Sequence, residues 1–416
     1  MKDSGIEWIG KIPQDWDIER IQWHLEEVNE INNPIQTTYI LSLNNKVGVI
    51  PYDDRDNMGN KAKDDYSQYK LAYPDTLVMN SMNVIIGSVG ISKYFGCVSP
   101  VYYVFKHNEN TDLRYINYIF QCEKFQKELR KYANGILEIR LRISVHDTLR
   151  RCMPCPNLSE QKRIADYLDE KCTEIDNAIS KTTASIEEYK KLKQSIITKA
   201  VTKGIRGNRP MKDSGIEWIG EIPADWEVKK IKWILSERKK RSVDGKEEPL
   251  SMSQKYGLIP TKNMDSIPNM ASSFVGAKIV QRGDLVFNKL KAYLGVFSVS
   301  DYNGLVSPDY AVYHSKGNVN VLFLEYLFKT PQCINEFNKL SSGVGAGLTR
   351  LYTSDLFSIK IAEPSKVEQD EIADYIKTKC TEIDIMLNKK NELITELEAY
   401  KKSLIYEYVT GKKEVV

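Results

Sequence analysis

One pair of cysteines has the spacing of half a structural zinc site. Cys152 and Cys155 form a CxxC pair, but no second pair exists to complete four ligands. Coordination would require His24, His107 or His146 to converge on the pair in the folded chain. The default interpretation is a strand edge with two incidental thiols, so the sequence predicts no metal site.

A second motif, the glycine-rich stretch GVGAG at 343–347, has the composition of a phosphate-binding loop. Such loops follow a strand, precede a helix and have an acidic residue further along the chain. The preceding residues 337–340 have a helical pattern instead. The stretch is therefore predicted to be a turn that belongs to its own domain.

Enzymes that act on nucleotides or nucleic acids have signatures that this chain lacks. There is no GxxxxGK[ST] loop and no N-P-P-[FY] adenine-methylase motif. Pro74-Asp75 and Pro308-Asp309 could begin a nuclease motif, but neither is followed by D/E-x-K at a suitable spacing. The four histidines show no HxxxH spacing. The sequence predicts no catalytic residue and no cofactor in this chain.

Composition narrows the class of protein further. The 416 residues are 42% hydrophobic and 28% charged, which is typical of a globular protein of roughly two to four domains. The net charge of +3 does not by itself indicate a nucleic-acid-binding protein. Seven cysteines, an odd number, and no membrane-spanning apolar run predict a cytoplasmic protein without a membrane segment.

The elements that would position any site belong to one unit that occurs twice. Residues 1–10 and 211–220 are the same ten letters, MKDSGIEWIG, and the match continues to 160–176 and 368–384. A repeat of this length predicts two copies of one domain arrangement, related by pseudo-two-fold symmetry, rather than an array of small repeats.

Each unit is expected to have a mixed head followed by a long helix. Short β-rich runs and one helical stretch indicate an α/β or α+β head. Apolar residues after the head recur at alternating steps of four and three, which is a heptad seam interrupted by polar residues at 182, 193, 390 and 401. The segments are 77–80, 84–89 and 101–105 for the runs, 113–132 for the helical stretch, and 164–200 and 372–408 for the seams.

The predicted fold is α+β, with two α/β-type globular domains separated by two long antiparallel coiled-coil helices. Two such helices in one chain pair most simply in antiparallel fashion. The predicted boundaries are 1–158 and 207–363 for the globular domains, and 159–206 and 364–416 for the helical spacers.

The order of these motifs resembles that of the specificity subunits of type I restriction–modification systems. SGIEWIG is followed by IP..W, a variable head, and P…EQ..IA.YL at the start of a long helix, and the whole series occurs twice. The resemblance implies two target-recognition domains, each reading one half of a split site in double-stranded DNA. It also implies helical regions that dock methyltransferase subunits. Two equivalent docking faces would accommodate two methyltransferase copies, and motor-endonuclease subunits would join that core. Catalysis, S-adenosylmethionine, Mg and ATP would belong to those partner subunits.

Two segments of each head are the candidate DNA readers. One follows the strand that starts at Leu77 or Leu285, and the other is the Gly-led segment at 134–142 or 343–350, which the resemblance places near DNA. Arg matches guanine edges and Asn matches adenine in the major groove, whereas other Lys and Arg residues would contact phosphate. The alternative is that such residues are solvated surface charges. The candidates are Asn80, Asn83, Lys93, Arg140 and Arg142 in the first copy, and Asn288, Lys289, Lys291, Thr349 and Arg350 in the second.

Two further expectations concern the surface of the protein, and one alternative function remains open. The basic run 238–241 either contacts phosphate or is an exposed loop. Four apolar helix residues outside the seam are expected to be exposed until methyltransferase helices cover them, namely Ile197, Val201, Ile405 and Val409. The alternative function is a coiled-coil scaffold that binds only proteins, which sequence-dependent DNA binding would exclude.

Overall fold

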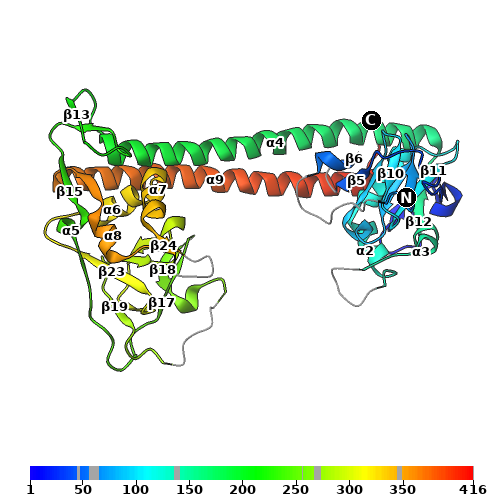
Figure 1. Ribbon diagram of the computed structural model, residues 1–416. Helices are drawn as coiled ribbons and strands as arrows, with labels where there is room; N and C mark the ends of the chain where they lie inside the picture. The colour runs from blue at the N-terminus through cyan, green and yellow to red at the C-terminus, as the bar shows by residue number, and fades with distance from the viewer. Residues whose placement is uncertain are drawn as a thin grey trace. The chain divides into compact units, whose positions relative to one another are not determined.

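The structure is a computed structural model that describes residues 1–44, 47–55, 65–134, 141–254, 256–266, 273–343 and 349–415. The chain divides into two compact units, one of Met1–Thr183 with Asn391–Val416 and one of Ala184–Lys390. Each unit combines a head of strands and short helices with segments of two long helices (Figure 1). The predicted α+β class with two heads and a long helix pair is confirmed.

The head of the first unit is built on an antiparallel sheet of four strands in the order β4-β11-β8-β9. These are β4 (Leu25–Glu27), β11 (Tyr102–His107), β8 (Leu77–Asn80) and β9 (Val89–Ile91). Two-stranded sheets accompany it: β1 (Lys2–Asp3) with β2 (Lys11–Ile12), β3 (Asp17–Arg20) with β12 (Cys152–Cys155), β5 (Leu41–Asn44) with β6 (Gly48–Pro51), and β7 (Lys70–Ala72) with β10 (Gly96–Val98). Its helices are η1 (Ile21–Trp23), η2 (Tyr52–Asp54), η3 (Val84–Ile86), α1 (Leu113–Gln121), α2 (Glu123–Arg130) and α3 (Val145–Leu149).

The head of the second unit repeats this plan. Its four-stranded sheet has the order β16 (Leu235–Glu237), β23 (Tyr310–Ser315), β20 (Leu285–Asn288) and β21 (Phe297–Val299). The two-stranded sheets are β13 (Met211–Asp213) with β14 (Glu221–Pro223), β15 (Glu227–Lys230) with β26 (Lys360–Glu363), β17 (Leu250–Ser253) with β18 (Gly257–Pro260), β19 (Lys278–Val280) with β22 (Gly304–Val306), and β24 (Ser342–Gly343) with β25 (Thr349–Arg350). Its helices are α5 (Ile231–Ile234), η4 (Thr261–Asn263), η5 (Ala292–Leu294), α6 (Val321–Phe328), α7 (Pro331–Leu340) and α8 (Thr353–Ser358).

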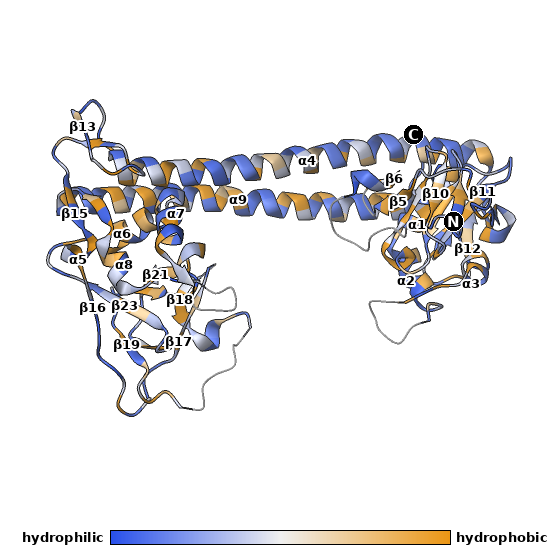
Figure 2. Cartoon of the chain, in the orientation of Figure 1, coloured by the Kyte–Doolittle hydropathy of each residue, from blue (hydrophilic) through white to orange (hydrophobic). Residues whose placement is uncertain are grey.

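The two long helices, α4 (Leu158–Lys203) and α9 (Lys366–Val409), contribute to both units. Hydrophilic and hydrophobic residues alternate along both of them (Figure 2), and no described helix is long and apolar enough to cross a membrane. Two of the polar interruptions of the seam form ion pairs at equivalent positions, one inside each unit. Lys401 Nζ lies 2.7 Å from Asp176 in the first unit, and Lys193 Nζ lies 2.6 Å from Asp384 in the second. Such pairs fix the register of antiparallel helices more than they add stability.

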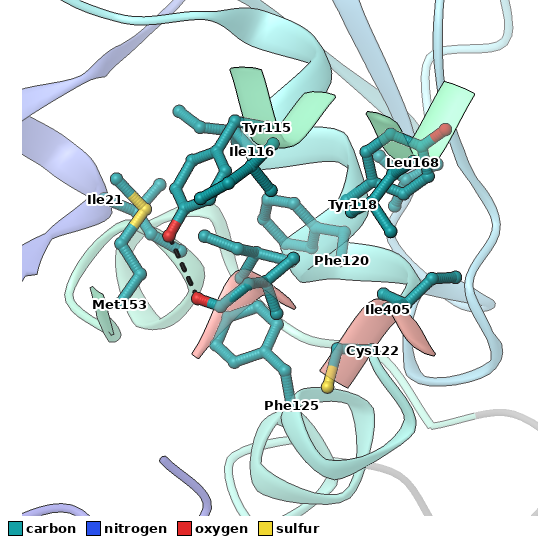
Figure 3. Packing of buried hydrophobic residues seen from close by; sticks show 14 of the residues in the cluster. Ile21, Tyr115, Ile116, Tyr118, Phe120, Cys122, Phe125, Met153, Leu168 and Ile405 are labelled. Carbon is teal, nitrogen blue, oxygen red and sulfur yellow. Dashed lines mark hydrogen bonds between the residues drawn. The ribbon is translucent and has the colours of Figure 1, made fainter. Parts of the chain in front are cut away.

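The four helix residues expected to be exposed are buried, so that expectation is wrong. Ile405 and Val409 lie in the core of the first unit, and Ile197 and Val201 in the core of the second. The reason is that each head packs on the helices. In the first unit, Tyr115 of α1 donates a hydrogen bond to the carbonyl oxygen of Val409 at 3.0 Å (Figure 3). Heptad spacing identifies the face toward the partner helix, but it carries no information about a head that covers another face.

Two local expectations also differ from the structure. Residues 84–89 do not form one strand, because Val84–Ile86 is the short helix η3 and β9 begins only at Val89. Gly87, with φ of 81°, follows η3 and reverses the chain there. The helical stretch at 113–132 is interrupted at Cys122, whose backbone is extended, and becomes α1 and α2.

Candidate nucleic-acid interface

The two candidate segments of each head meet at the same place in both copies. In the first head, the backbone amide of Ile143, next to Arg142, donates to the carbonyl of Ser81 at 3.2 Å. In the second head, the amide of Leu351, next to Arg350, donates to the carbonyl of Lys289 at 3.0 Å. These contacts occupy equivalent repeat positions. In each head, the loop after β8 or β20 therefore meets the residues that follow the Gly-led stretch of the sequence.

In the first head this meeting place is built around Ser81. Arg142, an exposed residue, donates from Nε to the Ser81 hydroxyl at 3.2 Å. That hydroxyl donates in turn to the carbonyl of Val101 at 2.7 Å. The hydrogen bond from Nε orients the guanidinium group. Its terminal nitrogens are the atoms that can donate hydrogen bonds to a guanine edge.

Asn80 and Asn288 have the same local role in the two heads. The side-chain oxygen of Asn80 accepts from the amide of Met82 at 3.1 Å, and that of Asn288 accepts from the amide of Leu290 at 3.1 Å. Asn80 is buried and Asn288 half-buried. Both side chains therefore shape the loop that follows their strand, as Asn does in an Asx turn.

The second head has more positive charge at the equivalent place. Burial, followed by repulsion from Lys278 and Arg350, lowers the pKa of Lys289. Arg350 donates from Nη2 to Asp309 at 3.2 Å, while its Nε is buried and has no hydrogen-bond partner among the described residues. A buried donor without a partner is costly, so Arg350 is held here at a free-energy cost.

An aromatic residue beside Arg350 was missed by the sequence reasoning. The guanidinium of Arg350 lies 5.9 Å from the ring centre of Tyr352, which is 43% exposed. Asp309, part of a possible nuclease motif in the sequence, pairs with Arg350 in the structure. An Arg-x-Tyr pattern just after a glycine-rich stretch of the sequence is the signal that could have drawn attention to the ring.

The remaining candidates are placed as follows. Asn83 and Lys291 occupy equivalent positions at the start of η3 and η5, where Lys291 is exposed. Thr349 lies in β25 opposite Gly343. Lys93 is exposed but lies beyond Ile91, which pairs with Leu77, so it is at the opposite end of the β8–β9 pair from Asn80. Arg140 lies outside the described residues.

The basic run at 238–241 is not uniform. Arg238 donates from Nε and Nη2 to the Asp284 carboxylate at 2.7 and 2.8 Å, and this interaction raises the pKa of Arg238. Lys240 and Arg241, by contrast, are exposed and line an open cavity of about 530 Å³ together with Gln281. Arg238 is therefore part of the internal structure, whereas the following basic residues face solvent.

Comparison with known proteins shows what this chain is similar to. Residues 223–395 match the family described as the type I restriction modification DNA specificity domain. Two relatives from Methanocaldococcus jannaschii align along nearly the whole chain. The putative type I restriction enzyme MjaX specificity subunit is 26% identical, covering 98% of this chain and 96% of the relative. The type I restriction enzyme MjaVIII specificity subunit is 25% identical, covering 97% and 94%.

Solved structures share the fold. A chain from a study of complex assembly and conformational transition of the type I R-M system has a TM-score of 0.73 at 13% identity, covering 97% of this chain and 100% of that one. The HsdS subunit from Thermoanaerobacter tengcongensis has a TM-score of 0.55 at 14% identity, covering 97% and 98%. These structures show the fold alone, whereas the family model and the two relatives confirm the resemblance to the specificity subunits of type I restriction–modification systems.

Proposed function

We propose that this chain is the DNA-reading, non-catalytic subunit of a type I restriction–modification complex, and that each head reads one half of a split DNA site. The observation that carries the proposal is the convergence of the two candidate segments at equivalent positions of both heads. One surface per head is the arrangement needed for two half-sites in double-stranded DNA.

Different side chains at equivalent positions support unlike half-sites. Arg142 and Arg350 correspond in the repeat, but Ser81 in the first head is replaced by Lys289 in the second, and Asn83 by Lys291. Both heads would use their arginine for a base edge, since Arg is the usual partner of guanine. The additional lysines of the second head would contact phosphate and bind more strongly at low salt.

The long helices would dock the methyltransferase subunits. Exposed apolar side chains remain on them after the heads have covered their own faces, and two of these, Leu192 and Tyr400, occupy equivalent repeat positions with 48% and 54% exposure. Equivalent positions of this kind suit two methyltransferase copies. Motor-endonuclease subunits would join that core in the cytoplasm, and S-adenosylmethionine, Mg and ATP would bind to the partner subunits rather than to this chain.

The test is a genome-wide map of N6-methyladenine in the source strain with and without this gene. We expect methylation to disappear at one split motif with two unlike halves, and to return when the gene is restored. An unchanged map, with the partner methyltransferase shown to be expressed, would contradict the proposal and leave the protein-binding scaffold as the explanation.

A further inference from the structure

Three potential metal ligands of different chemistry meet in the first unit. Glu19 belongs to β3, His24 follows η1, and Cys155 is the last residue of β12. Their ligand atoms lie within 4.8 Å of one another. His24 Nε2 is 2.7 Å from Glu19 Oε2 and 3.7 Å from Cys155 Sγ. Cys155 belongs to the CxxC pair, and His24 is the histidine that lies beside it in the folded chain.

A chain of hydrogen bonds determines which ring nitrogen of His24 faces this group. Asn108 donates from its side-chain amide to the carbonyl of Trp23 at 2.6 Å, so its Oδ1 is an acceptor. Thr111 donates its single hydroxyl proton to that Oδ1 at 2.7 Å. Thr111 Oγ1, 2.8 Å from His24 Nδ1, must therefore accept the Nδ1 proton.

Because Nδ1 carries a proton, Nε2 of His24 faces Glu19 with either a second proton or a lone pair. A lone pair at 2.7 Å from a carboxylate oxygen would be repulsive. Either a proton lies between the two atoms, carried by the imidazole or by the carboxyl group, or a metal ion takes its place. A histidine whose far nitrogen is held by a neighbouring acceptor is the usual arrangement of a metal ligand.

The second unit shows how the same place is filled without these ligands. The repeat positions of Glu19, His24, Thr111 and Cys155 are occupied by Lys229, Ile234, Val319 and Glu363. Lys229 Nζ lies 2.6 Å from Glu363 and 2.9 Å from Glu227, so the ammonium group provides a cation between the paired strands β15 and β26. The two units differ at all four positions, and the first unit has a glutamate where the second has this lysine.

We propose that Glu19, His24 and Cys155 bind one divalent transition-metal ion of the zinc class, which clamps the β3–β12 strand pair to the segment at His24. Oxygen, nitrogen and sulfur ligands together suit Zn²⁺, and three protein ligands leave a fourth position for water. A tetrahedral Zn²⁺ separates its N and S ligands by about 3.5 Å and its N and O ligands by about 3.4 Å. The observed N–S distance of 3.7 Å is close to this value. The Glu19 side chain, 35% exposed, has to move outward by several tenths of an ångström.

The first test measures binding to the full-length chain after chelation. Zn²⁺ is titrated in competition with a chromophoric chelator, and Co²⁺ is added separately as a spectroscopic probe. We expect one tight site per chain and a Co²⁺–thiolate absorption band in the near ultraviolet. His24→Ile and Cys155→Ser should each weaken Zn²⁺ binding by at least about tenfold. Cys152→Ser, which removes the other thiol of the same strand, should leave it unchanged.

A second test separates loss of metal from loss of folding. The triple variant Glu19→Lys, His24→Ile, Cys155→Glu installs the second unit's residues at the three ligand positions and should fold without a metal. The melting temperature of the parent chain should rise with Zn²⁺ and fall with chelator, and that of the triple variant should respond to neither. Absence of a tight site in the parent chain, or equal loss of binding in Cys152→Ser, would overturn the proposal. The outcome is independent of DNA reading, so either proposal can fail alone.

Discussion

The hydroxyl of Tyr115 ties the first head to the end of α9, and its removal should weaken that attachment. Tyr115 is fully buried, and its oxygen lies 3.0 Å from the carbonyl oxygens of both Pro154 and Val409. One hydroxyl has one proton to donate, so Tyr115→Phe removes one hydrogen bond and leaves a buried carbonyl oxygen without a donor. The expected cost is about 2 kcal/mol, because a buried group left without its partner loses about 1–3 kcal/mol. The equivalent residue of the second unit is already a phenylalanine, Phe323.

Calorimetry and hydrogen exchange would measure this effect. For a unit of this size, 2 kcal/mol corresponds to a fall in Tm of about 4–8 °C. Amide exchange should accelerate in α1 and at the end of α9, while α6 of the second unit, which holds Phe323, serves as the internal control. A change in Tm below about 1 °C, or equal acceleration in α6, would refute the argument that this hydroxyl fastens the first head to the helix.

Three other substitutions should have distinct effects. Asp284→Ala leaves the partly buried Arg238 without its partner and should lower the free energy of unfolding, measured by chemical denaturation, by about 3–5 kcal/mol. A loss below about 1 kcal/mol would mean that the pair is solvated. Lys193→Ala breaks a half-exposed pair with Asp384 and should change the free energy of unfolding by less than about 1 kcal/mol. A larger loss would show that this pair stabilises the helices as well as fixing their register. Lys289→Ala should reduce the slope of log affinity for DNA against log salt by about 0.9 if Lys289 contacts one phosphate, and an unchanged slope would exclude that contact.

The duplication, the heads and the paired helices were predictable because each has a local pattern. Identical letters at 1–10 and 211–220 reveal the repeat directly, and the heptad spacing reveals the helices. The polar residues 193 and 401, which interrupt that spacing, are the ones that pair with aspartates across the helix pair within their units. Sequence and structure therefore agree for the repeat and for the two long helices, whose patterns extend over many residues.

The parts that could not be predicted depend on contacts between distant residues. The burial of Val409 requires Tyr115, which lies 294 residues earlier in the chain. Arg238 begins a basic run in the sequence, but its partner Asp284 lies 46 residues away. His24 and Cys155 are 131 residues apart, so the CxxC spacing could not indicate that this histidine lies beside Cys155. Periodicity and composition describe single elements and do not specify which elements meet.

A methylation map of a symmetrised chain would test the central claim most directly. Residues 211–363 would replace residues 1–155, so that both heads carry the second reading surface on the equivalent helix positions. If each head reads one half-site, the methylated motif should change from two unlike halves to an inverted repeat of a single half. Retention of the original asymmetric motif by this chain would contradict the account, since the first head would then be shown to contribute nothing to the site.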